Sequence, residues 1–292
     1  MPAQPRPSLA PTPHPAPDVP RWRVYAVKYA ERDARRPEHF IGGDPHDAPM
    51  PMDYFVWAIV GSPDGTDDPA AEQVWVVDTG FDAAEASRRR RTLVRSVTDG
   101  LATLGIVAAE VTDVVLTHLH YDHVGGHAQF PSARFHLQDR EMEYATGRSM
   151  THPAISHAFT PGHVADLVHQ VYDQRVVFHD GDAELAPGIS LHLVGGHTKG
   201  LQVVRVATGV GWVVLASDAS HYYENMETGR PFTIVWNLED MLEGHRHCFR
   251  LASSPDLVVP GHDPEVLRRY PPAGPGLDGV AVRLDVHPSS PS

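Results

Sequence analysis

Four side chains that can bind a metal ion crowd into one short stretch of the sequence. The segment THLHYDH contains His118, His120, Asp122 and His123, directly after the apolar run 114–116. Side chains of an extended strand alternate between its two faces, so His118 and His120 project to the same side. Imidazole and carboxylate ligands together suit zinc and its first-row neighbours. A solvated polar loop is the alternative, but the apolar lead-in indicates a core strand, and the cluster therefore predicts a metal site.

Three further candidate ligands lie singly downstream. His197 follows the run ISLHLV, Asp218 ends WVVLASD, and His262 comes shortly after LVVP. Each stands where an apolar strand stops, and α/β folds place their chemistry in the loops at strand ends. A lone histidine in such a place is more often a surface residue. The repeated placement downstream of a four-ligand cluster favours a ligand role for all three.

The elements that must position these residues are short strands rich in β-branched side chains, with helices between them. The pattern predicts strands over 22–30, 54–60, 74–77, 111–118, 133–137, 176–180, 189–194, 201–207, 212–218 and 255–263. It predicts helices over 83–104, 141–144, 164–171 and 238–251. Strands and helices mixed in this way indicate an α/β fold with layered sheets.

Composition limits where and with what the protein acts. Residues 1–20 are rich in Pro and Ala and are expected to form a disordered tail, with one domain over 21–292. No apolar run reaches the ~20 residues that span a bilayer, and the tail has no signal-peptide core. Cys248 is the only cysteine and lies in a predicted helix, where we expect it to fill the core. A reducing cytoplasm is the simplest location for such a chain.

Charge argues against nucleic acid as a partner. The formal net charge is −13, whereas phosphate binding depends on clustered Lys and Arg. The one basic run, Arg88 to Arg91, lies in a predicted helix and is expected to be a solvated helix face.

The order of the seven candidate ligands resembles the metallo-β-lactamase superfamily. The pattern His-x-His-x-Asp-His, then Gly-His, a strand-terminal Asp and a second Gly-His fills every ligand position of that family. The segment VVDTG (76–80) is similar to its early Asp-Thr-Gly turn, and the resemblance extends from about Tyr54 to His262. It implies a four-layer αβ/βα sandwich with metal ions bound between the sheets.

The resemblance also implies how the ligands divide between two divalent transition-metal ions. His118, His120 and His197 would hold one ion, Asp122, His123 and His262 the other, and Asp218 would bridge them. Zinc is the first expectation, with iron, manganese and cobalt as alternatives for this donor set. Two ions ~3.5–4 Å apart can share a hydroxide and lower its pKa toward neutrality, so no Ser or Cys nucleophile is needed. Asp122 would also steer the proton of that hydroxide.

Within the superfamily the sequence is most similar to the N-acyl homoserine lactonase group. The segments THLHYDHVGG, GGHTKG, SDASHYYENM and VVPGHDPEV carry this resemblance. It implies a metal-dependent hydrolase that opens the lactone ring of bacterial quorum-sensing signals, and so a quorum-quenching activity. The expected partner is a small-molecule lactone or ester, with neither nucleic acid nor membrane. The sequence is compatible with a monomer or a homodimer.

One departure concerns the loop after Asp218. The lactonases usually have a tyrosine three residues after the bridging aspartate, where its hydroxyl contacts the substrate. Here that position is His221, followed by Tyr222 and Tyr223. His221 is the expected hydrogen-bond donor if the loop keeps the family's path, and Tyr222 if the loop is shifted by one residue.

Two other classes of function stay open. One is a carboxylic ester, thioester or phosphodiester hydrolase with the same metal site. The other is a metal-binding module without catalysis, which a missing ligand would favour. Apolar and aromatic residues that could line a substrate pocket, or equally pack in the core, are Met50, Met52, Tyr54, Phe55, Phe232 and Trp236.

Overall fold

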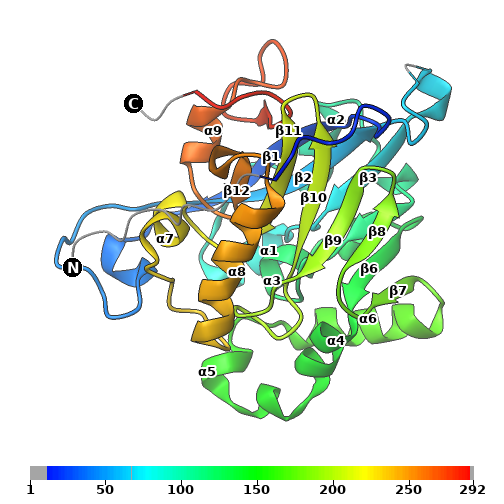
Figure 1. Ribbon diagram of the computed structural model, residues 1–292. Coiled ribbons are helices and arrows are strands. Elements are labelled where there is room, and N and C mark those ends of the chain that lie inside the picture. The colour runs from blue at the N-terminus through cyan, green and yellow to red at the C-terminus, as the bar shows by residue number, and fades with distance from the viewer. Residues whose placement is uncertain (1–11, 67, 290–292) are drawn as a thin grey trace.

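Two β-sheets packed face to face, with helices on their outer surfaces, form the protein (Figure 1). This computed structural model describes residues 12–66 and 68–289. The layers run helices, sheet, sheet, helices, which confirms the expected four-layer αβ/βα arrangement.

The first sheet has eight strands in the order β13-β1-β2-β3-β5-β6-β7, with β4 beside β1. Strands β1, β2 and β3 pair antiparallel, whereas β3, β5, β6 and β7 pair parallel. The strands are β1 (Arg23–Arg32), β2 (Met52–Gly61), β3 (Gln73–Val77), β4 (Thr92–Leu93), β5 (Asp113–Val115), β6 (Arg134–Gln138), β7 (Val176–His179) and β13 (Ala281–Arg283).

The second sheet has the order β12-β11-β10-β9-β8. Its pairs are antiparallel except for β11 and β12, which run parallel. Strands β9, β11 and β12 consequently point the same way, and their carboxyl ends meet at one edge. The strands are β8 (Ala183–Ala186), β9 (Ile189–Leu193), β10 (Gln202–Thr208), β11 (Gly211–Ser217) and β12 (Val258–Pro260).

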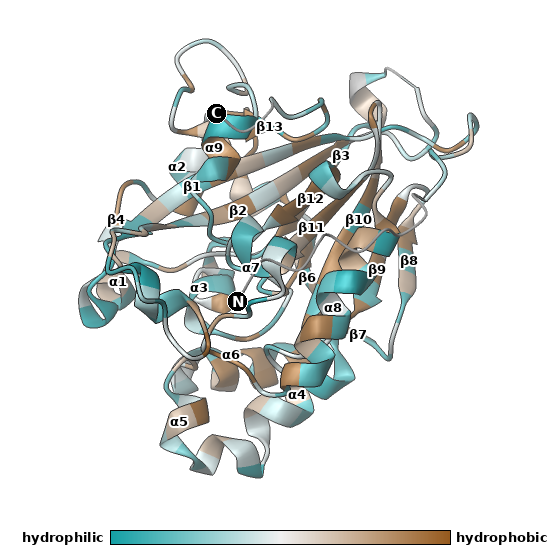
Figure 2. Ribbon diagram, turned by 60° about the vertical axis from the view of Figure 1, so that its left-hand side comes forward, coloured by the Kyte–Doolittle hydropathy of each residue, from teal (hydrophilic) through white to brown (hydrophobic). Residues whose placement is uncertain are grey.

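Strand β2 shows how sequence alternation builds the two hydrophobic layers. Its residues Phe55, Trp57 and Ile59 are buried in the core between the sheets. The intervening Tyr54 and Val56 face the opposite way, into the layer between the first sheet and its helices. Because successive side chains of a strand point to opposite faces, one apolar strand serves both layers. Figure 2 shows hydrophobic residues concentrated along the strands of both sheets.

Helices cover the outer faces. They are α1 (Ala83–Arg89), α2 (Val97–Ala102), α3 (Tyr121–Val124), α4 (Asp139–Thr146), α5 (Pro153–Ser156), α6 (Pro161–Tyr172), α7 (Tyr223–Thr228), α8 (Leu238–Leu251) and α9 (Glu265–Arg269). Short 3-10 turns lie at Arg36–His39, Pro69–Ala71, Ala108–Glu110, His127–Gln129, Arg148–Thr151 and Pro255–Leu257. Helix α8 has the predicted bounds and packs on the second sheet, where Asn237 caps its first turn and Cys248 fills the core as expected.

The single helix expected over 83–104 is wrong. Helix α1 ends at Arg89 because Arg90 adopts the left-handed conformation, with φ 55°. The chain then forms β4, where Leu93 pairs with Ala30 of β1, before α2 begins after its cap Ser96. Pairing with the sheet edge has overridden a helical spacing of apolar residues.

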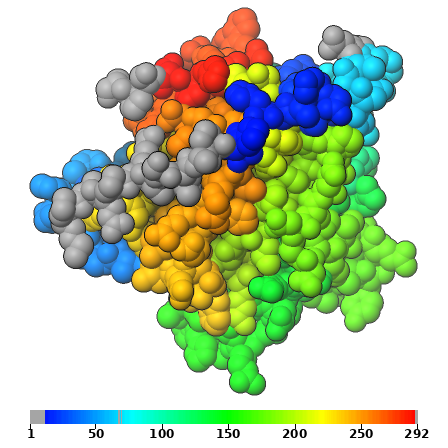
Figure 3. Space-filling view, viewed as in Figure 1, coloured from blue at the N-terminus to red at the C-terminus, as the bar shows by residue number. Residues whose placement is uncertain are grey.

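The Pro/Ala-rich N-terminal segment falls partly outside the described residues, at 1–11. Residues 12–20 lie against the surface of the domain, where Figure 3 shows their dark-blue atoms next to yellow and yellow-green ones. Pro15 and Pro20 are buried, and Arg21 donates hydrogen bonds to the carbonyls of Pro15 (2.9 Å) and Ala16 (3.1 Å). The expected disorder therefore does not describe these nine residues. Among the described residues no helix is long and apolar enough to cross a membrane.

Candidate metal centre

The structure brings all seven predicted ligands together at one edge of the sandwich. His118, His120, Asp122 and His123 follow strand β5, the last two within helix α3. The other three come from the second sheet: His197 after β9, Asp218 after β11 and His262 after β12. None of the seven is more than 8% exposed. Their convergence follows from sheet topology, because the carboxyl ends of these strands lie at the same edge.

Glycines before two of the ligands permit this close packing. Gly196 precedes His197 and has φ 84°, and a side chain there would meet the backbone of Met241 at 2.5 Å. Gly261 precedes His262, and a side chain there would come within 2.6 Å of the Asp218 carboxylate. Only glycine fits at these positions, which explains the two Gly-His pairs of the sequence.

Three imidazole nitrogens form the first cluster. His118 Nε2 lies 3.0 Å from His120 Nδ1, and His197 Nε2 lies 3.1 Å and 2.9 Å from these two atoms. Burial lowers the pKa of all three imidazoles, which keeps their lone pairs free of protons. One proton can bridge only one pair of nitrogens, whereas one cation can satisfy all three. The cluster therefore fits a metal ion.

The second cluster contains Asp122, His123 and His262. Asp122 Oδ2 lies 3.8 Å from His123 Nε2 and 3.7 Å from His262 Nε2. Burial disfavours charge on both imidazoles, but the surrounding carboxylates outweigh it and raise their pKa values. Sites that hold a proton against burial in this way also attract a divalent cation, which would replace that proton.

Asp218 lies between the two clusters. Its Oδ1 is 3.4 Å from His123 Nε2 and 3.1 Å from His262 Nε2, and its Oδ2 is 3.3 Å from His197 Nε2. His123 Nε2 and Asp218 Oδ1 are both buried without a hydrogen bond of acceptable geometry. Buried polar atoms are nearly always hydrogen-bonded, so two such atoms facing each other fit ligands of a cation. Asp218 thus presents one carboxylate oxygen to each cluster, which fits a carboxylate that bridges two metal ions.

Groups behind the ligands fix the orientation of their rings. Asp78 Oδ2 lies 2.7 Å from His123 Nδ1, and His197 Nδ1 lies 2.7 Å from the carbonyl of Ile234. The carbonyl of Asp53 is 2.9 Å from Nδ1 of His262. Each contact engages Nδ1 and so directs Nε2 toward the cluster. Asp78 belongs to the VVDTG segment, but its position at a strand end does not by itself reveal which ligand it supports.

A further buried carboxylate, Glu141 of α4, was missed at the sequence level. It accepts hydrogen bonds from the backbone N–H groups of Leu119 (2.9 Å) and Gly200 (3.1 Å), and so connects the two ligand-bearing loops. Burial raises its pKa to about 7. No sequence signal distinguishes it, because a glutamate in the first turn of a helix is usually a surface residue.

The two expected hydrogen-bond donors lie in different places. His221 lines the cavity above the ligands, with Nε2 2.9 Å from Asp218 Oδ2 and its ring stacked on Phe232 at 3.4 Å. Tyr222 does not line this cavity. Its hydroxyl lies 3.2 Å from His39 Nε2 and donates to the carbonyl of Pro51 at 3.1 Å. Only His221 of the two lines the cavity, so the geometry favours His221 over Tyr222 as the donor.

The cavity over the ligands has a volume of about 460 Å³. Of the residues expected to form a substrate pocket, Met52, Tyr54 and Phe232 line it. Phe55 is instead buried between the sheets, and Trp236 lies outside the lining, against Tyr144. A cavity of this size suits a small organic ligand.

The basic run 88–91 is only partly the solvated helix face that we expected. Arg89 and Arg91 both line the cavity, together with Arg32. The Arg89 guanidinium lies 4.1 Å from the centre of the Tyr121 ring. The run leaves α1 at the left-handed Arg90, and this change of direction turns Arg91 toward the ligands.

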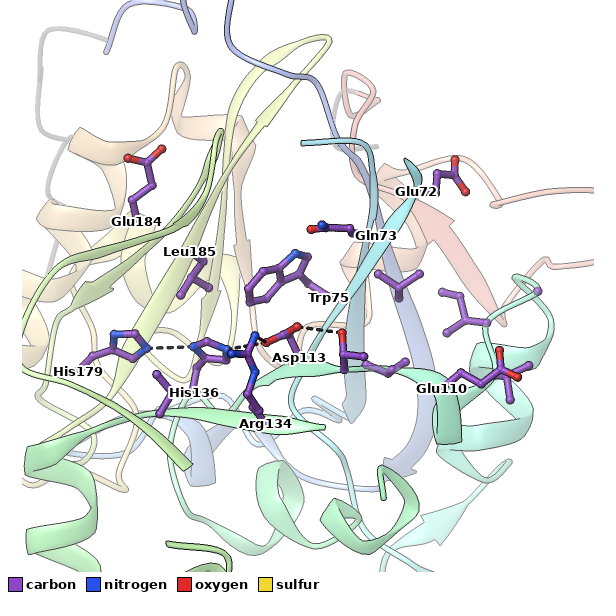
Figure 4. Close-up of a pocket in the computed structure, with 17 residues that line it drawn as sticks. Glu72, Gln73, Trp75, Glu110, Asp113, Arg134, His136, His179, Glu184 and Leu185 are labelled. Carbon is purple, nitrogen blue, oxygen red and sulfur yellow. Dashed lines mark hydrogen bonds and ion pairs between the residues drawn. The ribbon is translucent and has the colours of Figure 1, made fainter. Parts of the chain in front are cut away.

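A larger cavity, of about 760 Å³, lies elsewhere (Figure 4). There His136 lies 3.1 Å from both Asp113 and His179, and Arg134 forms an ion pair with Asp113 at 2.7 Å. Asp113 and Arg134 begin strands β5 and β6, at the opposite end of these strands from the ligands. None of the groups with metal-ligand geometry in the described part of the chain lies in this cavity.

Outside the main site, Asp182, His192 and His247 also have ligand atoms close together. His192 already contacts Asp182 through Nδ1 (2.8 Å) and Ser190 through Nε2 (2.9 Å). Both of its nitrogens thus have protein partners, and Asp182 is exposed. The buried seven-residue cluster fits a metal ion far better.

Comparison with known proteins agrees with this geometry. The family profile of the metallo-beta-lactamase superfamily matches residues 70–275. The chain belongs to the metallo-beta-lactamase superfamily. The N-acyl homoserine lactonase of Bacillus cereus is 28% identical over 133 residues, which cover 45% of this chain and 48% of that protein. A Mycobacterium tuberculosis protein named probable metallo-hydrolase is 27% identical over 189 residues, covering 56% and 58%.

The metallo-beta-lactamase fold is also found in similar solved structures. A quorum-quenching N-acyl homoserine lactone lactonase gives a TM-score of 0.68 at 20% identity, covering 85% of this chain and 95% of that one. The dizinc lactonase AidC, in complex with a hexanoyl-homoserine product, gives 0.63 at 18% identity, covering 84% and 89%. The chain spans about half the length of the curated relatives that it matches. At these identities the structural likeness establishes the fold.

Proposed function

We propose that this superfamily member is a metal-dependent hydrolase that opens lactone rings, with N-acyl homoserine lactones as its substrates. The observation that carries the proposal is the convergence of seven buried ligands beneath a cavity of about 460 Å³. Relatives and structural neighbours named as N-acyl homoserine lactonases support the choice of substrate.

Two divalent ions, zinc first among them, are the proposed cofactors. His118, His120 and His197 would hold one, and Asp122, His123 and His262 the other, with Asp218 between them. When bound, such ions supply a nucleophilic hydroxide at neutral pH and polarise the substrate carbonyl.

The chain's own residues would then handle protons and orientation. Asp122 lines the cavity, and its backbone carbonyl accepts a hydrogen bond from the Tyr29 hydroxyl at 2.9 Å, which fixes the start of α3. Its carboxylate can accept a proton from the attacking water and deliver it to the leaving oxygen. His221 contacts Asp218 through Nε2, so Nδ1 is the atom left to hydrogen-bond the substrate.

Hydrolysis of matched substrates tests the proposal. Proton release should be measured with N-hexanoyl homoserine lactone, a linear carboxylic ester, a thioester and a phosphodiester. We expect the lactone to be cleaved with the highest kcat/KM, activity to be lost with a chelator, and zinc to restore it. Turnover of the phosphodiester or thioester without turnover of the lactone would replace the lactonase assignment with one of those hydrolase classes. Full activity after complete metal removal would contradict a metal-dependent mechanism.

A further inference from the structure

Arg91 is a partly buried cation beside the metal ligands. Its Nε donates to the Tyr121 hydroxyl at 3.0 Å, and its Nη1 donates to the carbonyl of Arg89 at 2.8 Å. A guanidinium has five N–H donors, so these contacts leave three of them free. Neither contact supplies a negative charge.

The other arginines of the cavity are paired with carboxylates. Arg32 binds Glu38 at 2.8 Å, and Arg89 binds Glu85 at 2.7 Å. Within residues 12–66 and 68–289 no carboxylate forms an ion pair with Arg91. Burial disfavours the charge of Arg91, but Tyr54, Tyr121 and the more distant Asp122 carboxylate offset burial and raise the pKa of Arg91. None of them supplies a direct ion pair, so an anionic ligand group can add one.

The position of Arg91 is suited to a substrate contact. The Tyr121 hydroxyl, to which Arg91 donates, lies 3.4 Å from the Tyr54 hydroxyl. The Tyr54 ring in turn packs against the His262 ring, with ring centres 4.9 Å apart. Arg91, Tyr54 and His262 all line the same cavity. One small molecule can therefore reach both the ligand cluster and the guanidinium.

The rest of the lining gives the cavity two kinds of wall. Phe232 packs against His197 with ring centres 5.2 Å apart, and Ile234 lies beside it, so that side of the cluster is apolar. The side next to His262 carries phenols and Arg91. A chain with a net charge of −13 thus places at its candidate site an arginine that forms no ion pair with a carboxylate of the described residues.

We propose that Arg91 binds a negatively charged group of the substrate, so that the enzyme prefers lactones whose acyl chain ends in a carboxylate. The planar guanidinium matches a carboxylate through its two terminal nitrogens. This inference rests on the proposed lactone hydrolysis and specifies its substrate class.

A purely structural role for Arg91, holding Tyr121 in place, makes a different prediction. Loss of that support would impair neutral and anionic substrates alike, whereas loss of an anion-binding group changes the ratio between them. The specificity ratio, and not the activity on one substrate, separates the two roles.

The test uses two lactones of equal acyl length, N-succinyl and N-butanoyl homoserine lactone, which differ in a terminal carboxylate. For the wild-type protein we expect kcat/KM to be about tenfold or more higher for the succinyl compound, as a charge-assisted contact implies. In Arg91→Met the ratio should fall to near one, and in Arg91→Lys it should lie between. Arg140→Gln removes an exposed arginine of α4 outside the cavity and should keep the wild-type ratio.

Calorimetry provides a second readout that does not depend on turnover. The ring-opened products N-succinyl-homoserine and N-butanoyl-homoserine should differ in Kd by about tenfold for the wild type and by little for Arg91→Met. If Arg91→Met does not fold, Arg91→Lys supplies both measurements. Cleavage of both lactones at equal kcat/KM, with equal product Kd values, would overturn the role of Arg91 and leave the lactonase proposal standing. Cleavage of neither lactone would overturn the lactonase proposal, and the product Kd values would still decide on Arg91.

Discussion

The carboxylate of Asp78 lies 2.7 Å from Nδ1 of His123, although the two residues are 45 positions apart. The same carboxylate accepts a hydrogen bond from the backbone N–H of Thr117 through Oδ1 at 2.8 Å. It also accepts one from the Thr117 hydroxyl, which lies 3.0 Å from Oδ1 and 2.8 Å from Oδ2. Asp78 itself adopts a positive φ of 62°, which an aspartate tolerates better than most residues. The end of β3 therefore orients a proposed metal ligand that follows β5.

Asp78→Asn should weaken metal binding without changing the fold. The amide keeps the size of the side chain but loses the charge that holds the His123 ring, and removal of such a supporting group typically costs about 10–100-fold in metal affinity. Competition with a chromophoric chelator measures this loss. Asp33→Asn, at an exposed aspartate, is the control. Wild-type affinity in Asp78→Asn would show that the contact does not support the site.

The purified protein should contain about two transition-metal ions per chain. Seven ligands exceed the four of one tetrahedral site, and Asp218 presents one oxygen to each cluster. Elemental analysis after gel filtration gives the number. A fully active preparation with a single tightly bound ion would contradict the binuclear centre.

Asp218→Ala should lower the content of both ions, because it removes the proposed bridge. His157→Ala is the matched comparison: His157 lines the cavity but belongs to none of the ligand groups, and its Nδ1 lies 3.1 Å from the carbonyl of Ala154. We expect that variant to keep its metal. Full loading of Asp218→Ala, or metal loss in His157→Ala, would show that the ligands are assigned wrongly.

His221→Ala should reduce kcat by ~100-fold or more if its imidazole stabilises the charge that develops on the substrate. Metal content must be measured alongside, since His221 also contacts Asp218. Tyr222→Phe should keep kcat near the wild-type value and cost about 1 kcal/mol of stability, because Tyr222 does not line the cavity and its hydroxyl binds His39 and the carbonyl of Pro51. The reverse pattern would mean that Tyr222 is the donor.

Asp113 should make stability depend on pH. Burial opposes its ionisation, but His136, Thr112 and Arg134 outweigh burial and hold the pKa of Asp113 below its usual 3.8. A lowered native pKa contributes stability that is present above pH ~3.8 and is lost as the pH falls through the native value. The difference in unfolding free energy between wild type and Asp113→Asn should therefore shrink from pH 6 toward pH 3.5. A constant difference in urea titrations would contradict this contribution.

The proposed ligands could be predicted from the sequence alone, because each is marked by the order of residues within a short segment of the chain. An apolar strand followed directly by a histidine or aspartate can be read within about ten residues, and the spacing from His118 to His123 distinguishes this family. The bounds of α8 could also be predicted, since its apolar face and its cap Asn237 are local features. The layered α/β fold followed from the same patterns of strands and helices.

Only the tertiary structure decided which residues support the site and which face the substrate. Asp78 reaches His123, and Glu141 joins Leu119 to Gly200, because of the order and register of the sheets, which local periodicity does not encode. Helix α1 ends where β4 pairs with β1, and that pairing turns Arg91 into the cavity against its predicted place on a solvated helix face. Side-chain direction at such positions depends on contacts between segments far apart in the chain, and those contacts exist only once the sheets have assembled.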